Sequence, residues 1–508
     1  MRIGAVLVSV LLASQLAIAG GTVGFNVKWY SMPQLPSVDA GYPVTTGVVI
    51  ADFNRDGILD VAYSYPCCEN FSSGGGVIVK LGTGAGNLGP DVPYEFGQND
   101  LAEFKTADLN GDGWLDLMVA DVFYSSINVF LNNGDGTFYY PGKVGLGGTY
   151  SGSFTLGDFN HDGKIDLAEI GCGGLNGGGA SCTLNIGLGD GTGLNFAPSQ
   201  SIPLAGSSFN LQSADINGDG KLDFVFARGS VGVILWGRGD GTVSGPTYLR
   251  PSTTDPVDAV AVADFNNDGR LDLTLLSGEP CDPDPNRGPC GVGNVNTVWM
   301  YKNNGGTSFT LTTHSQFTAQ AGVIVPADIN GDLNQDVLHY NPFPEGLNPV
   351  RGGTGGYDYV LGLGNDTLGT QGTLSSSGIG AATFRDMNGD SRADYAVVDW
   401  YTNQLGIGIQ TGGWKNCPPP SSANLAAKIC GISNGAILTS PLLVKASGNS
   451  PAGVNQLQVW IDGKKQYVKW GDQLAKKFTL TSGKHRIAVV AYDKYIGHTT
   501  TAVNVNIP

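Results

Sequence analysis

Seven nine-residue segments of the chain carry oxygen-bearing side chains at one fixed spacing. Each reads D-x-N-x-D-x-x-x-D, with aspartate at positions 1, 5 and 9 and asparagine at position 3. These oxygens, with the backbone carbonyl of position 7, suit a hard cation that takes about 6–8 oxygen ligands, and calcium fits so many ligands in one self-contained loop better than magnesium. Glycine at position 6 in the first five copies permits the sharp turn that such a loop needs. The pattern predicts up to seven structural Ca²⁺ ions.

The predicted ligands occupy positions 1, 3, 5, 7 and 9 of each loop. Copy by copy they are Asp52, Asn54, Asp56, Ile58 and Asp60; Asp108, Asn110, Asp112, Trp114 and Asp116; Asp158, Asn160, Asp162, Lys164 and Asp166; Asp215, Asn217, Asp219, Lys221 and Asp223; Asp264, Asn266, Asp268, Arg270 and Asp272; Asp328, Asn330, Asp332, Asn334 and Asp336; and Asp386, Asn388, Asp390, Arg392 and Asp394. Copies six and seven depart from the pattern, because Leu333 and Ser391 replace the glycine.

Two other interpretations of these loops are possible from the sequence. An EF-hand needs a bidentate glutamate at position 12 and flanking helices, but only the third copy has a carboxylate there, Glu169, so an EF-hand is excluded. Turns rich in Asp, Asn and Gly can also form without metal. The formal charge of −16 favours a metal, since seven Ca²⁺ would bring it to about −2. The same acidity excludes broad attraction to nucleic acid or anionic lipid.

The spacing of the loops predicts the fold. They recur 49 to 64 residues apart, each between short apolar stretches such as Val48–Ala51 and Leu117–Ala120. Most repeats then carry a glycine-rich turn such as Gly239–Thr242. No long stretch keeps a 3.6-residue period, so helix should be scarce. Seven units of this length, each with about four strands, predict an all-β, seven-bladed β-propeller rather than an open solenoid.

The loops resemble the calcium-binding turns of FG-GAP/VCBS repeats, which occur in integrin α-chain propellers and fungal propeller lectins. The resemblance covers roughly residues 22–415 and implies that each loop joins the innermost strand of a blade to the second. The last blade then has three strands of its own, at Ala382–Asp386, Asp394–Trp400 and Leu405–Gln410. We expect Gly24–Ser31 to supply the fourth strand, which would close the ring and remove its edges.

The N-terminus and the cysteines predict a secreted protein. Residues 1–19 have the layout of a signal peptide, with Arg2, an apolar run over Ile3–Ala13 and small residues at Ala17 and Ala19. Eight cysteines fit an oxidising compartment. They fall into local pairs that predict disulfides, Cys67 with Cys68, Cys172 with Cys182, Cys281 with Cys290 and Cys417 with Cys430. The adjacent Cys67 and Cys68 could instead be free or pair elsewhere.

A second domain is expected after the propeller, which should span residues 20–415. Residues 416–435 read as a linker, and residues 436–508 as a small Ig-like β-sandwich. Asp462–Lys464 and Gly483–Asp493 resemble the DGK hairpin and the following strand of bacterial Ig-like modules. Such a module spaces or attaches a protein rather than catalysing a reaction.

We expect a ligand to bind on the face opposite the calcium loops, where the long connections lie. Long loops held by local crosslinks suit recognition, because less entropy is lost on binding. Candidate aromatic contacts at the edges of these loops are Tyr63, Tyr65, Phe123, Tyr124, Trp400 and Tyr401. The alternative is that these rings pack between blades.

The favoured function is a monomeric binding or adhesion protein that recognises a glycan or an extracellular protein, with calcium in a purely structural role. The first alternative is a polysaccharide-acting enzyme, because some lyases use a similar propeller; Arg351, Tyr357 and Tyr359 are loose candidates for its site. The second is a cell-surface spacer. Fold alone does not decide among them.

Overall fold

The computed structural model describes most of the chain from residue 23 onward. The residues that it does not describe are 1–22, 24, 33–46, 66–74, 99–100, 122–125, 148–150, 173–181, 205, 207, 252–254, 279–295, 318–322, 331–333, 341–356, 376–380, 389–391, 400–403, 412–419, 421–423, 439, 441, 452, 471–472 and 494–496. The predicted signal peptide therefore lies outside the described residues. The described part of the chain contains β-strands and no helix, which confirms the predicted all-β class.

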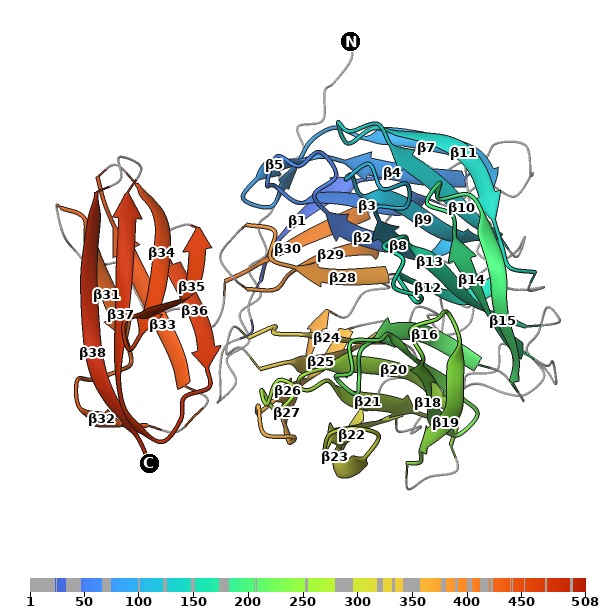
Figure 1. Cartoon of the computed structure of the whole chain (residues 1–508). Helices are drawn as coiled ribbons and strands as arrows, with labels where there is room; N and C mark the ends of the chain where they lie inside the picture. The colour runs from blue at the N-terminus through green and yellow to red at the C-terminus, as the bar shows by residue number, and fades with distance from the viewer. Residues whose placement is uncertain are drawn as a thin grey trace, which may run out of the picture.

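Among the residues that the structure describes, seven antiparallel sheets of four strands each lie between positions 25 and 410 (Figure 1). In chain order their strands are β2 (Val48–Ala51), β3 (Asp60–Tyr65), β4 (Gly75–Lys80) and β7 (Val92–Gln98); β8 (Leu101–Ala107), β9 (Asp116–Asp121), β10 (Ser126–Asn132) and β11 (Phe138–Val144); β12 (Ser151–Gly157), β13 (Asp166–Cys172), β14 (Cys182–Gly189) and β15 (Phe196–Leu204); β16 (Ser208–Ala214), β17 (Asp223–Arg228), β18 (Val231–Gly237) and β19 (Val243–Leu249); β20 (Val257–Ala263), β21 (Asp272–Ser277), β22 (Asn296–Asn303) and β23 (Phe309–Phe317); β24 (Val323–Ala327), β25 (Asp336–Tyr340), β26 (Tyr357–Gly362) and β27 (Leu368–Ser375); and β28 (Ala381–Arg385), β29 (Asp394–Asp399), β30 (Gln404–Gln410) and β1 (Phe25–Ser31). A small hairpin of β5 (Gly82–Gly84) and β6 (Asn87–Leu88) follows β4.

The last sheet is completed by the start of the described chain, as predicted. Strand β1 pairs antiparallel with β30 over its whole length, from Phe25 opposite Gln410 to Ser31 opposite Gln404. The order β1-β30-β29-β28 therefore unites residues almost 400 positions apart in one sheet. This pairing satisfies the edge of β30, which would otherwise expose unpaired backbone groups.

Hydrophobic clusters join each sheet to the next. Phe53, Phe130 and Phe138 belong to a cluster shared by the first and second sheets, and further clusters link every later pair in turn. Another cluster joins the β28-containing sheet back to the first, with Ile50 among its members. The two middle strands of a sheet are covered on both faces by neighbouring sheets, which is why β9 and β10 are buried along their whole length. Separate twisted sheets packed side by side in this way form a β-propeller.

A β-sandwich follows the propeller and has a core of its own. One sheet has the order β31-β33-β36 and the other β32-β38-β37-β34-β35. The strands are β31 (Ala426–Cys430), β32 (Ala436–Ile437), β33 (Leu442–Asn449), β34 (Val454–Ile461), β35 (Lys464–Trp470), β36 (Gln473–Phe478), β37 (Gly483–Asp493) and β38 (His498–Ile507). Its buried cluster draws on both sheets, for example Val444 from one and Val489 from the other.

The predicted boundary between linker and sandwich needs correction. Residues 426–430 were expected to belong to a linker, but they form β31, which pairs with β33. The sequence there is short and mixed, and its partner Lys445–Asn449 follows only after residues 431–444, so no local pattern reveals the pairing. The sandwich therefore begins at or before Ala426.

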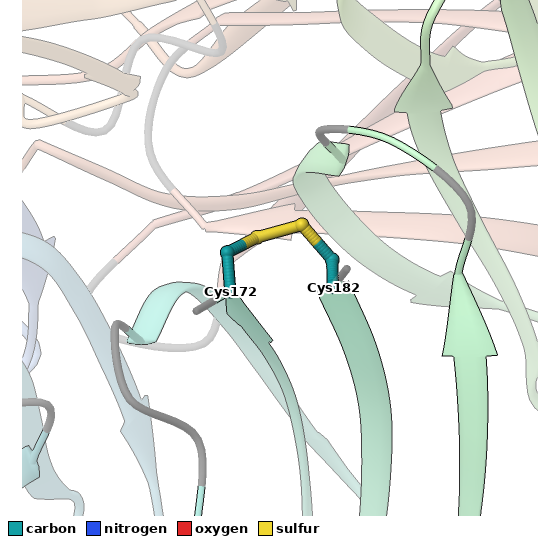
Figure 2. Close-up of a disulfide and its surroundings, with 2 residues drawn as sticks. All are labelled: Cys172 and Cys182. Atoms are coloured by element: carbon teal, nitrogen blue, oxygen red, sulfur yellow. A yellow bond between two sulfur atoms is a disulfide. The ribbon is translucent and has the colours of Figure 1, made fainter. Parts of the chain in front are cut away.

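One predicted disulfide is seen directly. Cys172 and Cys182 are bonded at an S–S distance of 2.02 Å, at the end of β13 and the start of β14 (Figure 2). Their bond closes the base of the connection between these two strands. Cys430 is also disulfide-bonded. Its predicted partner Cys417 lies outside the described residues, as do Cys67, Cys68, Cys281 and Cys290.

Candidate functional site: the seven aspartate loops

Each aspartate loop connects the first strand of a sheet to the second, as the family resemblance implied. The first five loops share two positions with left-handed backbone. Position 6 is glycine in all five, with φ between 81° and 92°, for example 82° at Gly57. Position 4 is left-handed as well, and there Arg55, His161 and Asn267 tolerate φ values of 55° to 62°. The glycine at position 6 is thus required by backbone conformation, as the sequence predicted.

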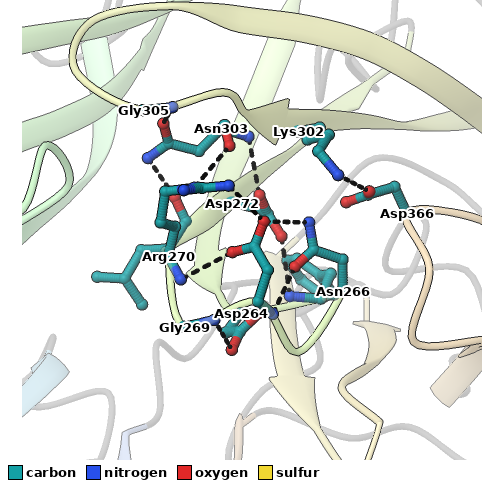
Figure 3. A network of polar contacts seen from close by, with 12 residues as sticks. Asp264, Asn266, Gly269, Arg270, Asp272, Lys302, Asn303, Gly305 and Asp366 are labelled. Atoms are coloured by element: carbon teal, nitrogen blue, oxygen red, sulfur yellow. Dashed lines mark hydrogen bonds and ion pairs between the residues drawn. The ribbon is translucent and has the colours of Figure 1, made fainter. Parts of the chain in front are cut away.

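Hydrogen bonds inside the loop hold its oxygens in place. In the fifth loop the amide of Asp268 donates to Asn266 Oδ1 (2.8 Å), the amide of Gly269 to Asp264 Oδ2 (3.0 Å) and the amide of Arg270 to Asp268 Oδ1 (2.9 Å) (Figure 3). The same three bonds recur in each of the first four loops. The loop is therefore organised by its own backbone around the side chains of positions 1, 3 and 5.

The aspartate at position 9 has a role that the sequence did not reveal. In the fifth loop Asp272 is fully buried, and its carboxylate accepts bonds from the amide of Phe265 to Oδ2 (3.1 Å) and from that of Asn303 to Oδ1 (2.8 Å). The first amide belongs to loop position 2, and the second lies at the end of the sheet's third strand. All seven copies make the same pair of bonds. Position 9 is a clamp that ties the loop to its own sheet.

Burial raises the pKa of these clamp carboxylates. The pKa of Asp60 is raised to about 6 by burial, and the nearby negative charges of Asp56 and Asp52 add to the rise. Asp116, Asp223 and Asp272 have pKa values near 6 for the same first cause. The three aspartates of a loop therefore lie close enough to repel one another, a repulsion that a bound cation would relieve.

Some oxygens at position 1 are left without a partner. Oδ1 of Asp52 and Oδ1 of Asp108 are buried and accept no hydrogen bond. An orphaned buried carboxylate oxygen is costly, and a cation is one way to satisfy it. Such oxygens beside the amide oxygen of position 3 are the ligand type that Ca²⁺ takes. The residues of the first two loops fit the predicted ion.

Other features of the loops place limits on that fit. In three loops the position-3 amide donates to the position-5 carboxylate, as Asn54 does to Asp56 (3.0 Å), and this uses an oxygen predicted to bind metal. Across the part of the chain that the structure describes, no three His, Cys, Asp or Glu side chains gather into a metal-holding group. In loops six and seven, Asp332 and Asp390 lie outside the described residues.

The loops also connect neighbouring sheets. The side-chain amide of Asn132, in the second sheet, donates to the carbonyl of Phe53 at position 2 of the first loop (2.8 Å). Asn303 does the same to Ile216 (2.7 Å), and Gln410 bonds to the carbonyl of Ile329. The residue at position 2 thus donates its backbone N–H to the clamp of its own sheet, and its carbonyl accepts a hydrogen bond from the next sheet.

Where the third strand ends in glycine instead, the reason is steric. A Cβ added at Gly237 would overlap the carbonyl oxygen of Leu222, and Gly189 and Gly362, which also end third strands, meet the equivalent backbone oxygen, as does Gly82, two residues after the end of β4. At these ends the position-9 clamp accepts the glycine amide, for example from Gly237 to Asp223 Oδ1 (2.9 Å). The turn that follows can supply the link between sheets, as the amide of Gly241 does to the carbonyl of Phe159 (2.9 Å).

Two of the six aromatic residues that were predicted to contact a ligand lie in the described part of the chain. Tyr63 and Tyr65 are buried in the cluster between the last and first sheets, so the packing alternative describes both rings and neither offers a face to a ligand. Their strand β3 is a middle strand, covered by sheets on both sides. Phe123, Tyr124, Trp400 and Tyr401 lie outside the described residues.

The loose enzyme candidates are not brought together by the described residues. Tyr359 is 2% exposed and packs in the core between the sixth and seventh sheets, where burial raises its pKa. Arg351 lies outside the described residues, and nothing is described of the Tyr357 side chain.

An open cleft of about 720 Å³ lies between the second and third sheets. Lys143, Asn195 and Phe196 are among its lining residues. Ser126, which also lines it, is 7% exposed, and its Oγ is buried without a hydrogen-bond partner. No sequence pattern singled out this cleft, because its walls come from segments about 50 residues apart.

Comparison with known proteins agrees with the repeat architecture. Residues 108–168 and 215–274 match the FG-GAP-like repeat family, each segment beginning at position 1 of an aspartate loop. The chain therefore contains FG-GAP-like repeats, and together with its four-stranded sheets they support a repeat β-propeller. No curated protein sequence matches the chain.

Solved structures are only loosely similar. A lectin from Agrocybe aegerita, described as recognising non-reducing terminal N-acetylglucosamine, is 15% identical, with 66% of this chain and 81% of the lectin covered and a TM-score of 0.40. The rhamnogalacturonan lyase YesW is 12% identical, with 95% and 91% covered and a TM-score of 0.35. A protein from Lactobacillus plantarum is 11% identical, with 70% and 91% covered and a TM-score of 0.39. Similarities this low assign no activity.

Within the described residues, no helix has the length and apolar character needed to cross a membrane.

Proposed function

We propose that this chain is a secreted, calcium-stabilised, seven-bladed propeller that binds a glycan or an extracellular protein, and that carries a C-terminal Ig-like domain. The observation that carries the calcium proposal is the pair of buried, unpartnered Oδ1 atoms of Asp52 and Asp108 inside preorganised loops. The seven sheets and the clusters between them support a closed ring. The Cys172–Cys182 disulfide supports an oxidising compartment.

Calcium has a structural role in this proposal. The loops join sheets to one another through position 2, so an ion that fixes a loop also fixes the joint beside it. We expect Asp112→Ala to lower the melting temperature in calcium-containing buffer and to leave ligand specificity unchanged. A changed binding profile with unchanged melting would show instead that the ion touches the ligand. Equilibrium dialysis with ⁴⁵Ca²⁺ should detect fewer bound ions in this variant than in the wild type.

Ligand binding is supported by a rigid scaffold that carries long connections. The β13–β14 connection, closed at its base by Cys172–Cys182, emerges at the strand ends opposite the aspartate loops. The experiment is a screen of polysaccharides and glycans against the mature chain in millimolar calcium, with product release measured in the same wells. Retention without products supports the binding protein. Released products would favour the polysaccharide-acting enzyme, and no retention at all would favour a protein partner or a spacer.

A further inference from the structure

The two parts of the chain carry opposite charge. Residues 426–508, which form the sandwich, contain ten Lys and Arg against three Asp and Glu, a net charge of +7. Residues 1–425 contain eighteen Lys and Arg against 41 Asp and Glu, a net charge of −23. Half of the basic residues of the sandwich lie on two strands: Lys464, Lys465, Lys469, Lys476 and Lys477.

These two strands, β35 and β36, form neighbouring edges of the sandwich. β35 is the last strand of one sheet and β36 the last strand of the other. Both lie on the side of the sandwich that faces the propeller (Figure 1). Lysines on edge strands commonly protect them from pairing with other chains. If the lysines only protected these edge strands from pairing with other chains, they would not need to contact hydrogen-bond acceptors on the propeller.

Two of these lysines contact the aspartate loops. Lys469 Nζ lies 3.4 Å from Oδ2 of Asp386, position 1 of the seventh loop, and the two side chains are only 20% and 26% exposed. Lys477 Nζ donates to Oδ1 of Asn334, position 7 of the sixth loop. The same oxygen accepts a bond from Nδ2 of Asn267, position 4 of the fifth loop (3.1 Å). One sandwich edge therefore reaches a surface built from three successive loops.

We propose that the β35–β36 edge is an intramolecular docking surface, which holds the sandwich against the loop face of the fifth, sixth and seventh sheets through Lys469 and Lys477. The partner is this chain's own acidic propeller, recognised by ammonium groups that meet loop oxygens. Partly buried charge pairs fix orientation more than they add stability. The docked sandwich covers part of the loop face.

Small-angle X-ray scattering of the mature full-length chain tests this. A compact chain of this length has a radius of gyration of about 23 Å. We expect Lys469→Glu/Lys477→Glu to raise the measured radius by on the order of 2–4 Å, because these contacts would then no longer hold the sandwich against the loop face. Asn334→Lys, made on the propeller side to repel Lys477, should expand the molecule in the same way. The control is Lys464→Glu/Lys465→Glu, which makes the same charge change at exposed positions of β35.

The measurements are made in EDTA and repeated in calcium, so that the result in EDTA does not depend on the proposed ion. Circular dichroism and melting curves confirm that each variant is folded. An unchanged radius in the Lys469/Lys477 variant and in Asn334→Lys would overturn the proposal. Equal expansion in the control pair would also overturn it, because the effect would then follow net charge rather than these contacts.

Discussion

Replacing Asp116 by asparagine tests the clamp at position 9. This carboxylate is fully buried and accepts the amides of Leu109 (2.9 Å) and Asn132 (2.8 Å). Asparagine has nearly the same shape but only one accepting oxygen. Its NH₂ group would face one of the two backbone N–H groups, which would leave that N–H buried without an acceptor.

The expected cost follows from these two bonds. A hydrogen bond to a charged group contributes about 1.5–3 kcal/mol, and a buried donor left unpaired costs about 1–3 kcal/mol. The sum is a loss of about 2.5–6 kcal/mol in the free energy of unfolding. An opposing effect operates without calcium, because burial and the charges of Asp112 and Asp108 raise the pKa of Asp116 to about 6. A neutral side chain escapes that repulsion, so we expect the loss to be smaller in EDTA than in calcium.

Differential scanning calorimetry in calcium and in EDTA, at about pH 7.5, measures both quantities. The matched control is Asp135→Asn, an exposed aspartate whose Oδ1 accepts bonds from Thr137 and whose replacement should leave the melting temperature close to that of the wild type. If Asp116→Asn melts like the control in both buffers, position 9 is not a clamp. If its loss is larger in EDTA than in calcium, the account of the charges is wrong.

Three further outcomes are expected. Gly237→Ala should cost about 1–3 kcal/mol, because its Cβ would meet the Leu222 carbonyl, whereas Gly245→Ala, which meets nothing within 4 Å, should be near neutral in thermal melts. Cys172→Ser/Cys182→Ser should cost about 3 kcal/mol, since it opens a loop of separation 10; melting unchanged from that of the oxidised wild type would contradict this. In EDTA the clamp carboxylates, with pKa values near 6 in the fold against 3.8 unfolded, bind more protons when folded. Melting temperature should therefore rise as pH falls from about 7 to 5, and calcium should flatten that profile.

The sequence predicted the fold well because its strongest signals are local and repeated. Seven copies of a nine-residue pattern at similar spacing define the repeat, and glycine at position 6 marks a backbone conformation that the structure confirms at Gly57 and its equivalents. The pairing of β1 with β30 was also predicted, since the last repeat was short of one strand. The metal ligands at positions 1, 3, 5, 7 and 9 stay predictions.

What the sequence could not show depends on residues distant in the chain. In the sequence Asp116 is only a predicted cation ligand, and its clamp role appears once Asn132, sixteen residues later, is seen to donate to it. Tyr63 and Tyr65 border a long connection, but the neighbouring sheet that covers them comes from the other end of the propeller. The sequence predicts a linker where β31 lies, because the partner of this strand follows only after an intervening segment.

A loop can be hydrogen-bonded both to its own sheet and to the next one, so the repeated aspartates affect how neighbouring sheets are joined. The carbonyl of Phe53 is held by the second sheet through Asn132, while its amide is held by the Asp60 clamp of the first. Any displacement of the loop therefore strains two sheets. In the first three loops, the three carboxylates repel one another, and this repulsion would loosen such a joint. A cation in the loop reverses the sign of that effect, so the proposed calcium should make unfolding of the propeller more cooperative as well as raising its melting temperature.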